Sequence, residues 1–75
     1  MSAAAQVRVD ARGLLCPQPV LMLARAAKAQ PGALVEVLAD DPAAATDIPA
    51  WCRMRGAELV SADPNAGAWL VRVPG

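Results

Sequence analysis

The stretch that decides the fold is residues 7–19, which read VRVDARGLLCPQP. Residues 7–11 alternate apolar and polar side chains, the period-two pattern of a half-buried strand. Gly13 breaks this pattern, and Pro17 and Pro19 follow it. Two prolines so close together are compatible with the opening turn of a helix, because the N–H groups there have no intrahelical partner. The stretch therefore predicts a strand, a short loop and the start of a helix.

The rest of the chain continues with patterns of the same kind. Apolar residues recur at helical spacing after Pro17 until Pro31 and Gly32 stop the helix. Gly56 is well suited to end a second helix, and the turn-rich segment 63–67 is typical of a β-hairpin. The elements expected after the first strand are a helix over about 17–30, a strand over 34–39, a helix from about 45–47 to 56 with Pro49 in its first turn, and strands over about 58–62 and 68–73.

This order of elements, βαβαββ, indicates the fold class. Charged residues occupy alternate strand positions at Arg8, Asp10, Glu36 and Arg72, so we expect one side of the sheet to face solvent and both helices to cover the other. The sequence predicts an α/β (α+β) two-layer sandwich, in which a four-stranded mixed sheet carries two helices on one face. The order of the strands within the sheet stays open.

Length and composition limit the chain to one small domain. It has 75 residues, of which 56% are hydrophobic and 19% are charged. A chain of this size has no room for a second core, and this composition is too apolar for disorder. We expect a single domain over residues 1–75, structured from about 6 to 73. Seven basic residues balance seven acidic ones, so we expect no direct nucleic-acid partner, since such binding needs a basic field.

The distribution of apolar residues bears on location. The longest apolar run, from Val20 to Ala24, is far shorter than the roughly 18 residues of a membrane span. The N-terminus lacks a basic region followed by an apolar one, so we expect a cytoplasmic protein with no membrane partner. Cytosolic thiols are kept reduced, which disfavours a disulfide between Cys16 and Cys52.

The reactive side chains narrow the chemistry to cysteine. The chain has no histidine, so neither a Ser–His nor a Cys–His pair can form. Cys16 and Cys52 form no C-x-x-C pair, which argues against a zinc site and a thioredoxin-like dithiol. Cys16 directly precedes the proline-opened helix, so we expect it at the N-cap. Free N–H groups and the positive end of the helix dipole would there lower the thiol pKa below ~8.5 and favour a nucleophilic thiolate.

Other polar and sulfur-containing residues favour structural roles. Cys52 lies within the second helix, where we expect it to pack in the core. Asp40 and Asp41 could orient a partner or a proton, but an acidic pair before a helix is more often a cap. Surface arginines are solvated by default. A cationic patch for a partner could come from Arg12, Arg53 and Arg55.

Residues 10–19, DARGLLCPQP, match the D-x-x-G-L-x-C-P-x-P signature of the TusA/SirA-like sulfur carrier family. A second characteristic block of that family is matched by ADDP at 39–42, DIP at 47–49 and WC at 51–52. The resemblance spans residues 7–73. It implies a two-layer sandwich with sulfurtransferase activity, in which Cys16 accepts sulfane sulfur as a persulfide and passes it to another protein without a metal or cofactor.

The resemblance also implies partners and roles. The donor would be a cysteine desulfurase or a rhodanese, and the acceptor a DsrE/TusD-like protein, in tRNA thiolation, molybdenum cofactor assembly or sulfur oxidation. Gly13, Pro17 and Pro19 would position Cys16. Gln18 stands where close members often carry Glu. The residues that would contact partners are Arg12, Gln18, Asp40 and Asp41.

Two other function classes stay open from the residues alone. A regulatory or binding module of the same fold would make Cys16 dispensable, whereas a redox protein would need Cys16 and Cys52 to pair. Alkylation of the native protein separates these classes, because a carrier should expose a reactive Cys16 and protect Cys52.

Overall fold

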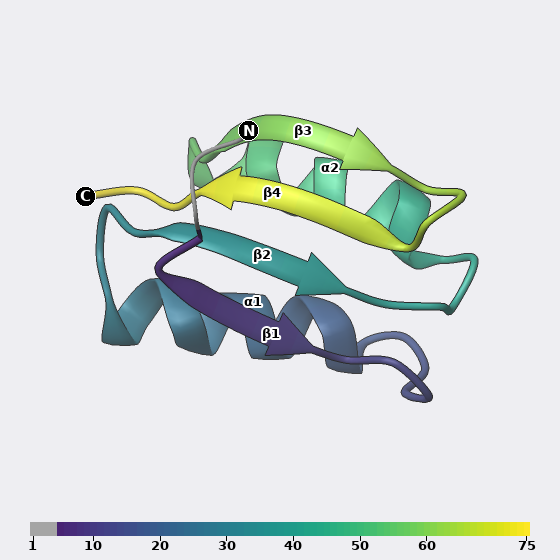
Figure 1. Cartoon of the computed structure of the whole chain (residues 1–75). Helices are drawn as coiled ribbons and strands as arrows, with labels where there is room; N and C mark the ends of the chain where they lie inside the picture. The colour runs from purple at the N-terminus through teal and green to yellow at the C-terminus, as the bar shows by residue number, and fades with distance from the viewer. Residues whose placement is uncertain (1–4) are drawn as a thin grey trace.

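The computed structural model describes residues 5–75, and its elements follow the predicted βαβαββ order (Figure 1). The first four residues of the expected domain lie outside the described part. The strands and helices are β1 (Val7–Asp10), α1 (Gln18–Ala29), β2 (Leu34–Leu38), α2 (Ala44–Arg55), β3 (Glu58–Asp63) and β4 (Ala68–Arg72).

The four strands form one mixed sheet in the order β1-β2-β4-β3. β1 and β2 are parallel, while β4 is antiparallel to both β2 and β3. The hairpin thus folds back so that its second strand, β4, pairs with β2. Both helices cover the same face of this sheet, α1 behind β1 and β2, and α2 behind β3 and β4 (Figure 1). The predicted two-layer sandwich is confirmed.

The core lies between the sheet and the helices. Alternate strand residues point into it, so Val35, Val37 and Val71 are fully buried. Leu23 of α1 and Ile48 of α2 meet them from the helix side and are also fully buried. Burial of each such side chain contributes roughly 1.5–3 kcal/mol before the entropy of ordering it is subtracted. Trp51 and Trp69 also belong to this core. A chain of this length needs such efficient burial of its large apolar side chains.

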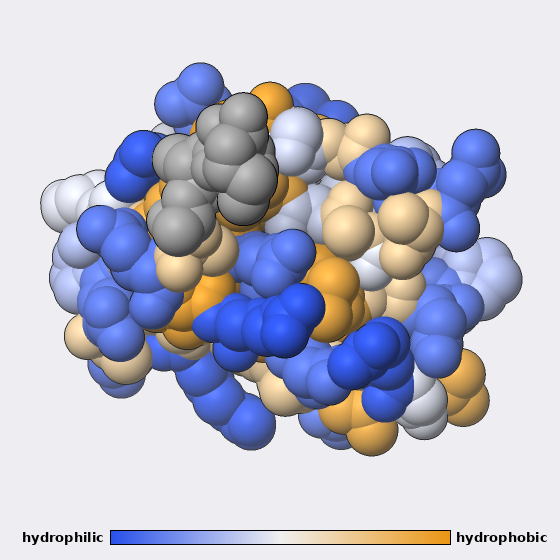
Figure 2. Space-filling view, in the orientation of Figure 1, coloured by the Kyte–Doolittle hydropathy of each residue, from blue (hydrophilic) through white to orange (hydrophobic). Residues whose placement is uncertain are grey.

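The opposite face of the sheet carries no helix and faces solvent. Arg8 and Glu36 are directly opposite each other on β1 and β2, and the Arg8 Nε lies 3.0 Å from the Glu36 Oε1. Figure 2 shows hydrophilic residues on this face with hydrophobic ones between them. The expected polar face is present, although Leu34 on it is buried.

The start of α2 differs from the prediction. The helix begins at Ala44, so Pro49 lies in its second turn and not in the first. Asp41 explains the early start, because its carboxylate accepts the N–H of Ala43 and its carbonyl accepts the N–H of Ala44. These bonds close a turn directly after β2. The helix ends at Arg55 with Gly56 as its C-cap, as the sequence predicts.

Candidate functional site

The loop that carries Cys16 lies at the edge of the sheet where the parallel strands β1 and β2 end (Figure 1). It leaves β1 after Asp10 and turns at once, since the N–H of Leu14 donates to the Ala11 carbonyl at 3.1 Å. Gly13 has a φ of 80°, a left-handed conformation that other residues rarely adopt. Residues 12–18 are all exposed, which leaves Cys16 open to solvent.

Two carboxylates from the turn after β2 hold this loop in place. The N–H of Gly13 donates to Asp40 Oδ1 at 2.9 Å, and the N–H of Cys16 donates to Asp41 Oδ2 at 2.6 Å. Adjacent parallel strands end at the same edge of a sheet, so the turn after β2 comes beside the loop after β1. Asp41 uses its other oxygen for the Ala43 N–H, at 3.1 Å. Asp41 therefore closes the turn before α2 and is not its cap, since the N-cap is Ala43 and has no side-chain cap hydrogen bond. It also binds the backbone of Cys16, which the sequence reasoning missed.

The electrostatic environment of Cys16 contradicts the sequence-based expectation. The N-cap of α1 is Pro17, so Cys16 lies one residue before the cap and outside the helix. Hydrogen bonding to the Asp47 carboxylate, partial desolvation and the negative charges of Asp47 and Asp41 raise the pKa of the Cys16 thiol. The expected lowering of this pKa by the helix N-terminus is wrong, because the carboxylates of Asp47 in α2 and of Asp41 in the preceding turn disfavour the thiolate.

Replacing Asp47 should change the ionisation of Cys16. We expect Asp47→Asn to lower the pKa of the thiol, because the substitution removes a negative charge that disfavours the thiolate. The rate of iodoacetamide alkylation measured against pH should then rise at lower pH than in the unsubstituted protein. Asp63→Asn, in the β3–β4 hairpin, is the control and should leave the profile in place. Identical profiles for Asp47→Asn and the unsubstituted protein would show that this carboxylate does not act on Cys16.

The other predicted site residues lie around the same loop. Arg12 is paired with Asp10, with its Nη2 2.7 Å from Asp10 Oδ2. Hydrogen bonding from the Arg12 side chain lowers the pKa of Asp10 to about 2. Gln18 is exposed at the first turn of α1, whereas Pro19 is buried beneath it. Arg12 and Gln18 are therefore exposed to solvent, and Pro19 is buried in the first turn of α1.

Exposed leucines beside Cys16 add a feature that the sequence analysis did not single out. The side chain of Leu15 is 72% exposed and that of Leu14 is 39% exposed. Large apolar side chains on a surface loop commonly mark a protein contact. The signal was present in the sequence, since both leucines directly precede the cysteine in a loop that cannot bury them.

Cys52 lies in the core, as predicted. Its residue is 3% exposed, and burial raises the pKa of its thiol. We expect Cys52→Ala to reduce the free energy of unfolding by about 1 kcal/mol through lost packing. Urea denaturation measures this loss, and the variant should keep the reactivity of Cys16. A folded Cys52→Ala chain with an inert Cys16 would instead indicate a dithiol mechanism.

The described residues also bear on metals and membranes. Among residues 5–75, no group of three or more Cys, Asp or Glu side chains is arranged to hold a metal ion. No helix within the same range is long and apolar enough to cross a bilayer.

Comparison with known proteins agrees with this geometry. Residues 7–74 match the family model described as sulfurtransferase TusA. The chain is 44% identical over 63 residues to the sulfur carrier protein TusA of Pseudomonas paraeruginosa. The aligned region covers 83% of this chain and 80% of that protein. The sulfur carrier protein TusA of Pseudomonas syringae pv. syringae is 43% identical over 83% of this chain and 75% of its own length. With its fold, its Cys-Pro-x-Pro loop and these relatives in agreement, the chain belongs to the sulfurtransferase TusA family.

Proposed function

We propose that this protein is a sulfur carrier that holds sulfane sulfur as a persulfide on Cys16. The observation that carries the proposal is the contrast between its two thiols: Cys16 is exposed on a braced loop, and Cys52 is buried in the core. A relay between proteins needs one accessible thiol, and transfer between proteins favours a protruding loop over an enclosed pocket. The same contrast disfavours a redox pair, because Cys52 cannot reach an external disulfide without unfolding.

The proposed step is an exchange at sulfur. The Cys16 thiolate attacks the terminal sulfur of a donor persulfide, the sulfur–sulfur bond of the donor breaks, and the donor leaves as a thiolate. Cys16 then carries the persulfide, and the proton released from its thiol balances the thiolate left on the donor. No net oxidation occurs, so the step requires no metal or cofactor. Reversal of the same chemistry on an acceptor thiol releases the sulfur.

Because the pKa of Cys16 is raised, the donor would also have to promote formation of the Cys16 thiolate. Asp47 and Asp41 disfavour the thiolate, so the isolated carrier keeps most of its thiol neutral near pH 7. A donor that places a positive group beside Cys16 on docking would offset these charges and increase the fraction of thiolate in the complex. This arrangement protects the free thiol from unwanted oxidation, because the thiolate is the reactive form.

Family membership supports a proposal for the partners and for the roles of the loop residues. We propose a cysteine desulfurase or a rhodanese as donor and a DsrE/TusD-like protein as acceptor, in the cytoplasm. Gly13, Pro17 and Pro19 shape the loop, and Arg12 and Gln18 contact partners. We assign Asp40 and Asp41 a positioning role, because their carboxylates already accept backbone N–H groups of the loop.

The test is mass spectrometry after sulfur loading. The protein is incubated with a cysteine desulfurase and cysteine, and its intact mass is measured before and after reduction with dithiothreitol. We expect a reducible gain of one sulfur atom, which peptide mapping assigns to the segment containing Cys16. A gain on Cys52, or no gain with a desulfurase that loads another carrier in parallel, contradicts the proposal.

A further inference from the structure

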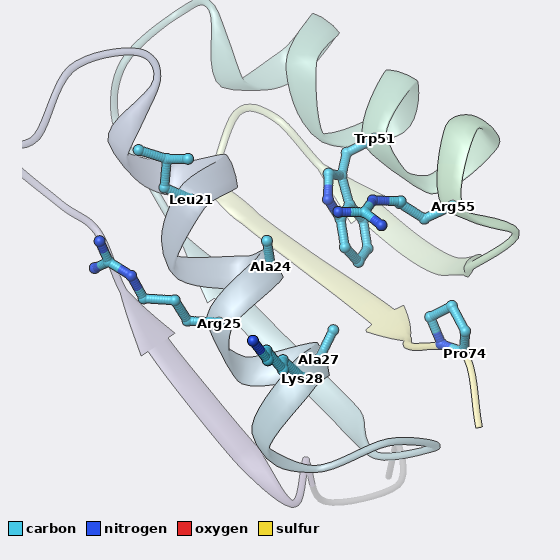
Figure 3. Close-up of a pocket in the computed structure, with 8 residues that line it drawn as sticks. All are labelled: Leu21, Ala24, Arg25, Ala27, Lys28, Trp51, Arg55 and Pro74. Atoms are coloured by element: carbon cyan, nitrogen blue, oxygen red, sulfur yellow. The ribbon is translucent and has the colours of Figure 1, made fainter.

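A groove between α1 and α2 lies on the side of the molecule opposite the open face of the sheet (Figure 3). Its volume is about 530 Å³, within the range of known ligand sites. Apolar side chains form its floor. They include Leu21, Ala24, Ala27 and Trp51. Leu21 is 41% exposed, and Trp51 closes the base with 7% exposure. The groove is therefore an apolar surface open to solvent and unused by the Cys16 chemistry.

The charged residues that line the groove are all positive, and two of them, Lys28 and Arg55, lie at one end of it. Lys28 is in the last turn of α1 and Arg55 is the last residue of α2. In Figure 3 the Arg55 side chain extends from α2 towards the groove, whereas Arg25 points away from it. No acidic residue is among the described side chains that line the groove. A ligand that fits this surface needs an apolar face and negative charge.

The other end of the groove lies close to the Cys16 loop. The N–H of Leu21 donates to the Pro17 carbonyl at 3.0 Å, so Leu21 follows one helical turn after the residue next to Cys16. The residues of α1 that line the groove run from Leu21 to Lys28, which corresponds to a length of about 10 Å along the helix. A ligand lying along the groove would extend from the cationic end to the edge that presents the thiol.

We infer that this groove docks an amphipathic α-helix with acidic side chains, supplied by a protein partner. A helix laid into an apolar groove places side chains at i, i+3, i+4 and i+7 against the floor. The small side chains of Ala24 and Ala27 allow close approach of its backbone, and Trp51 offers a large apolar contact. Its acidic residues pair with Lys28 and Arg55. The identity of the partner as a sulfur donor or acceptor rests on the proposed function, but the docking itself does not.

Lys28 and Arg55 also complement the negative ends of their own helix dipoles. Arg53 allows the effect of charge on the groove to be separated from its effect on the helix dipole. It lies in the same last turn of α2 and is exposed, yet it does not line the groove. Arg53→Glu therefore changes the dipole interaction about as much as Arg55→Glu does, without changing the groove.

The test uses a synthetic helical peptide of about 14 residues, with leucines spaced to form one face and glutamates elsewhere. A second peptide replaces every glutamate with lysine. Binding to the ¹⁵N-labelled protein is followed by NMR, where the indole N–H of Trp51 reports the groove and that of Trp69, which does not line the groove, is the internal reference. We expect the acidic peptide to shift the Trp51 signal and the basic peptide to leave it unchanged.

The variants give the decisive comparison. Lys28→Glu combined with Arg55→Glu should weaken binding of the acidic peptide by roughly tenfold, and Arg53→Glu by less than about twofold. Lys28→Gln with Arg55→Gln serves if the charge reversal impairs folding, and should weaken binding by a smaller factor. Equal weakening by Arg53→Glu, equal binding of the basic peptide, or no binding of the acidic peptide overturns the inference. So does a shift of Trp51 by dodecanoate and not by the peptide, which would assign the groove to a small amphipathic anion.

A separate measurement distinguishes failure here from failure of the proposed function. The same variants are loaded on Cys16 with a low-molecular-weight persulfide, which needs no docked helix. Loading should be unchanged in all of them. A protein that binds the peptide but cannot be loaded retains the docking groove and loses the carrier function. A protein that is loaded but binds no peptide retains the carrier function and loses the groove.

Discussion

Cys16→Ser should fold like the unsubstituted protein and accept no sulfur. Serine is close to cysteine in size, and the side chain of residue 16 is exposed, so no core packing is lost. The loop keeps its anchors, because the hydrogen bond to Asp41 comes from the backbone N–H and not from the sulfur. A hydroxyl has no nucleophilicity comparable to that of a thiolate and forms no persulfide. The loss of sulfur acceptance should therefore be complete.

Intact-mass analysis with a desulfurase and cysteine measures this loss, and urea denaturation shows whether the free energy of unfolding has changed. Cys52→Ala is the matched control, since it removes the other thiol and should retain full loading. If a folded Cys16→Ser chain still gains sulfur, Cys16 is not the carrier residue. If it gains none and also unfolds, the comparison is repeated with Cys16→Ala, which has no hydroxyl to form new hydrogen bonds.

Asp41→Asn should disturb both the loop and the helix that Asp41 joins. The two carboxylate oxygens each accept a different N–H, one from Cys16 at 2.6 Å and one from Ala43 at 3.1 Å. Asparagine offers a single oxygen, and its NH₂ group faces an N–H donor on the other side. One of the two bonds must be lost. We expect the free energy of unfolding to fall by about 1–2 kcal/mol, and sulfur loading to slow by roughly tenfold as the loop loses its position.

Asp40→Asn is the matched control for this prediction. Asp40 binds one N–H, that of Gly13 at 2.9 Å, and the amide oxygen of asparagine can accept the same bond. Its effect on stability and loading should be small. Amide hydrogen exchange identifies which contact is lost in Asp41→Asn, since the protection of Cys16 and of Ala43 is measured separately. Equal effects of the two substitutions would show that the bridging geometry of Asp41 is not what positions the loop.

Much of the fold could be read from local sequence. Alternation over residues 7–11, the prolines that open α1 and the glycine that closes α2 each act through the backbone conformation of a few neighbouring residues, and all were predicted. The start of α2 was predicted too late because the side chain of Asp41 closes a turn earlier in the chain than the position of Pro49 suggested. The strand order could not be predicted, because it depends on which edge of the sheet the hairpin pairs with.

By itself the sequence determined that one cysteine is presented on a loop and that the other is packed in a helix. Gly13 interrupts the strand pattern before Cys16 and Pro17 precedes the helix, while the apolar spacing around Cys52 directs it to the core. Only the tertiary structure decided in which direction the pKa of the Cys16 thiol is shifted. The carboxylates of Asp41 and Asp47 come from segments far along the chain and reach the thiol because β1 and β2 lie parallel and end at the same edge. Electrostatic interactions depend on distance in space, which sequence separation does not reveal.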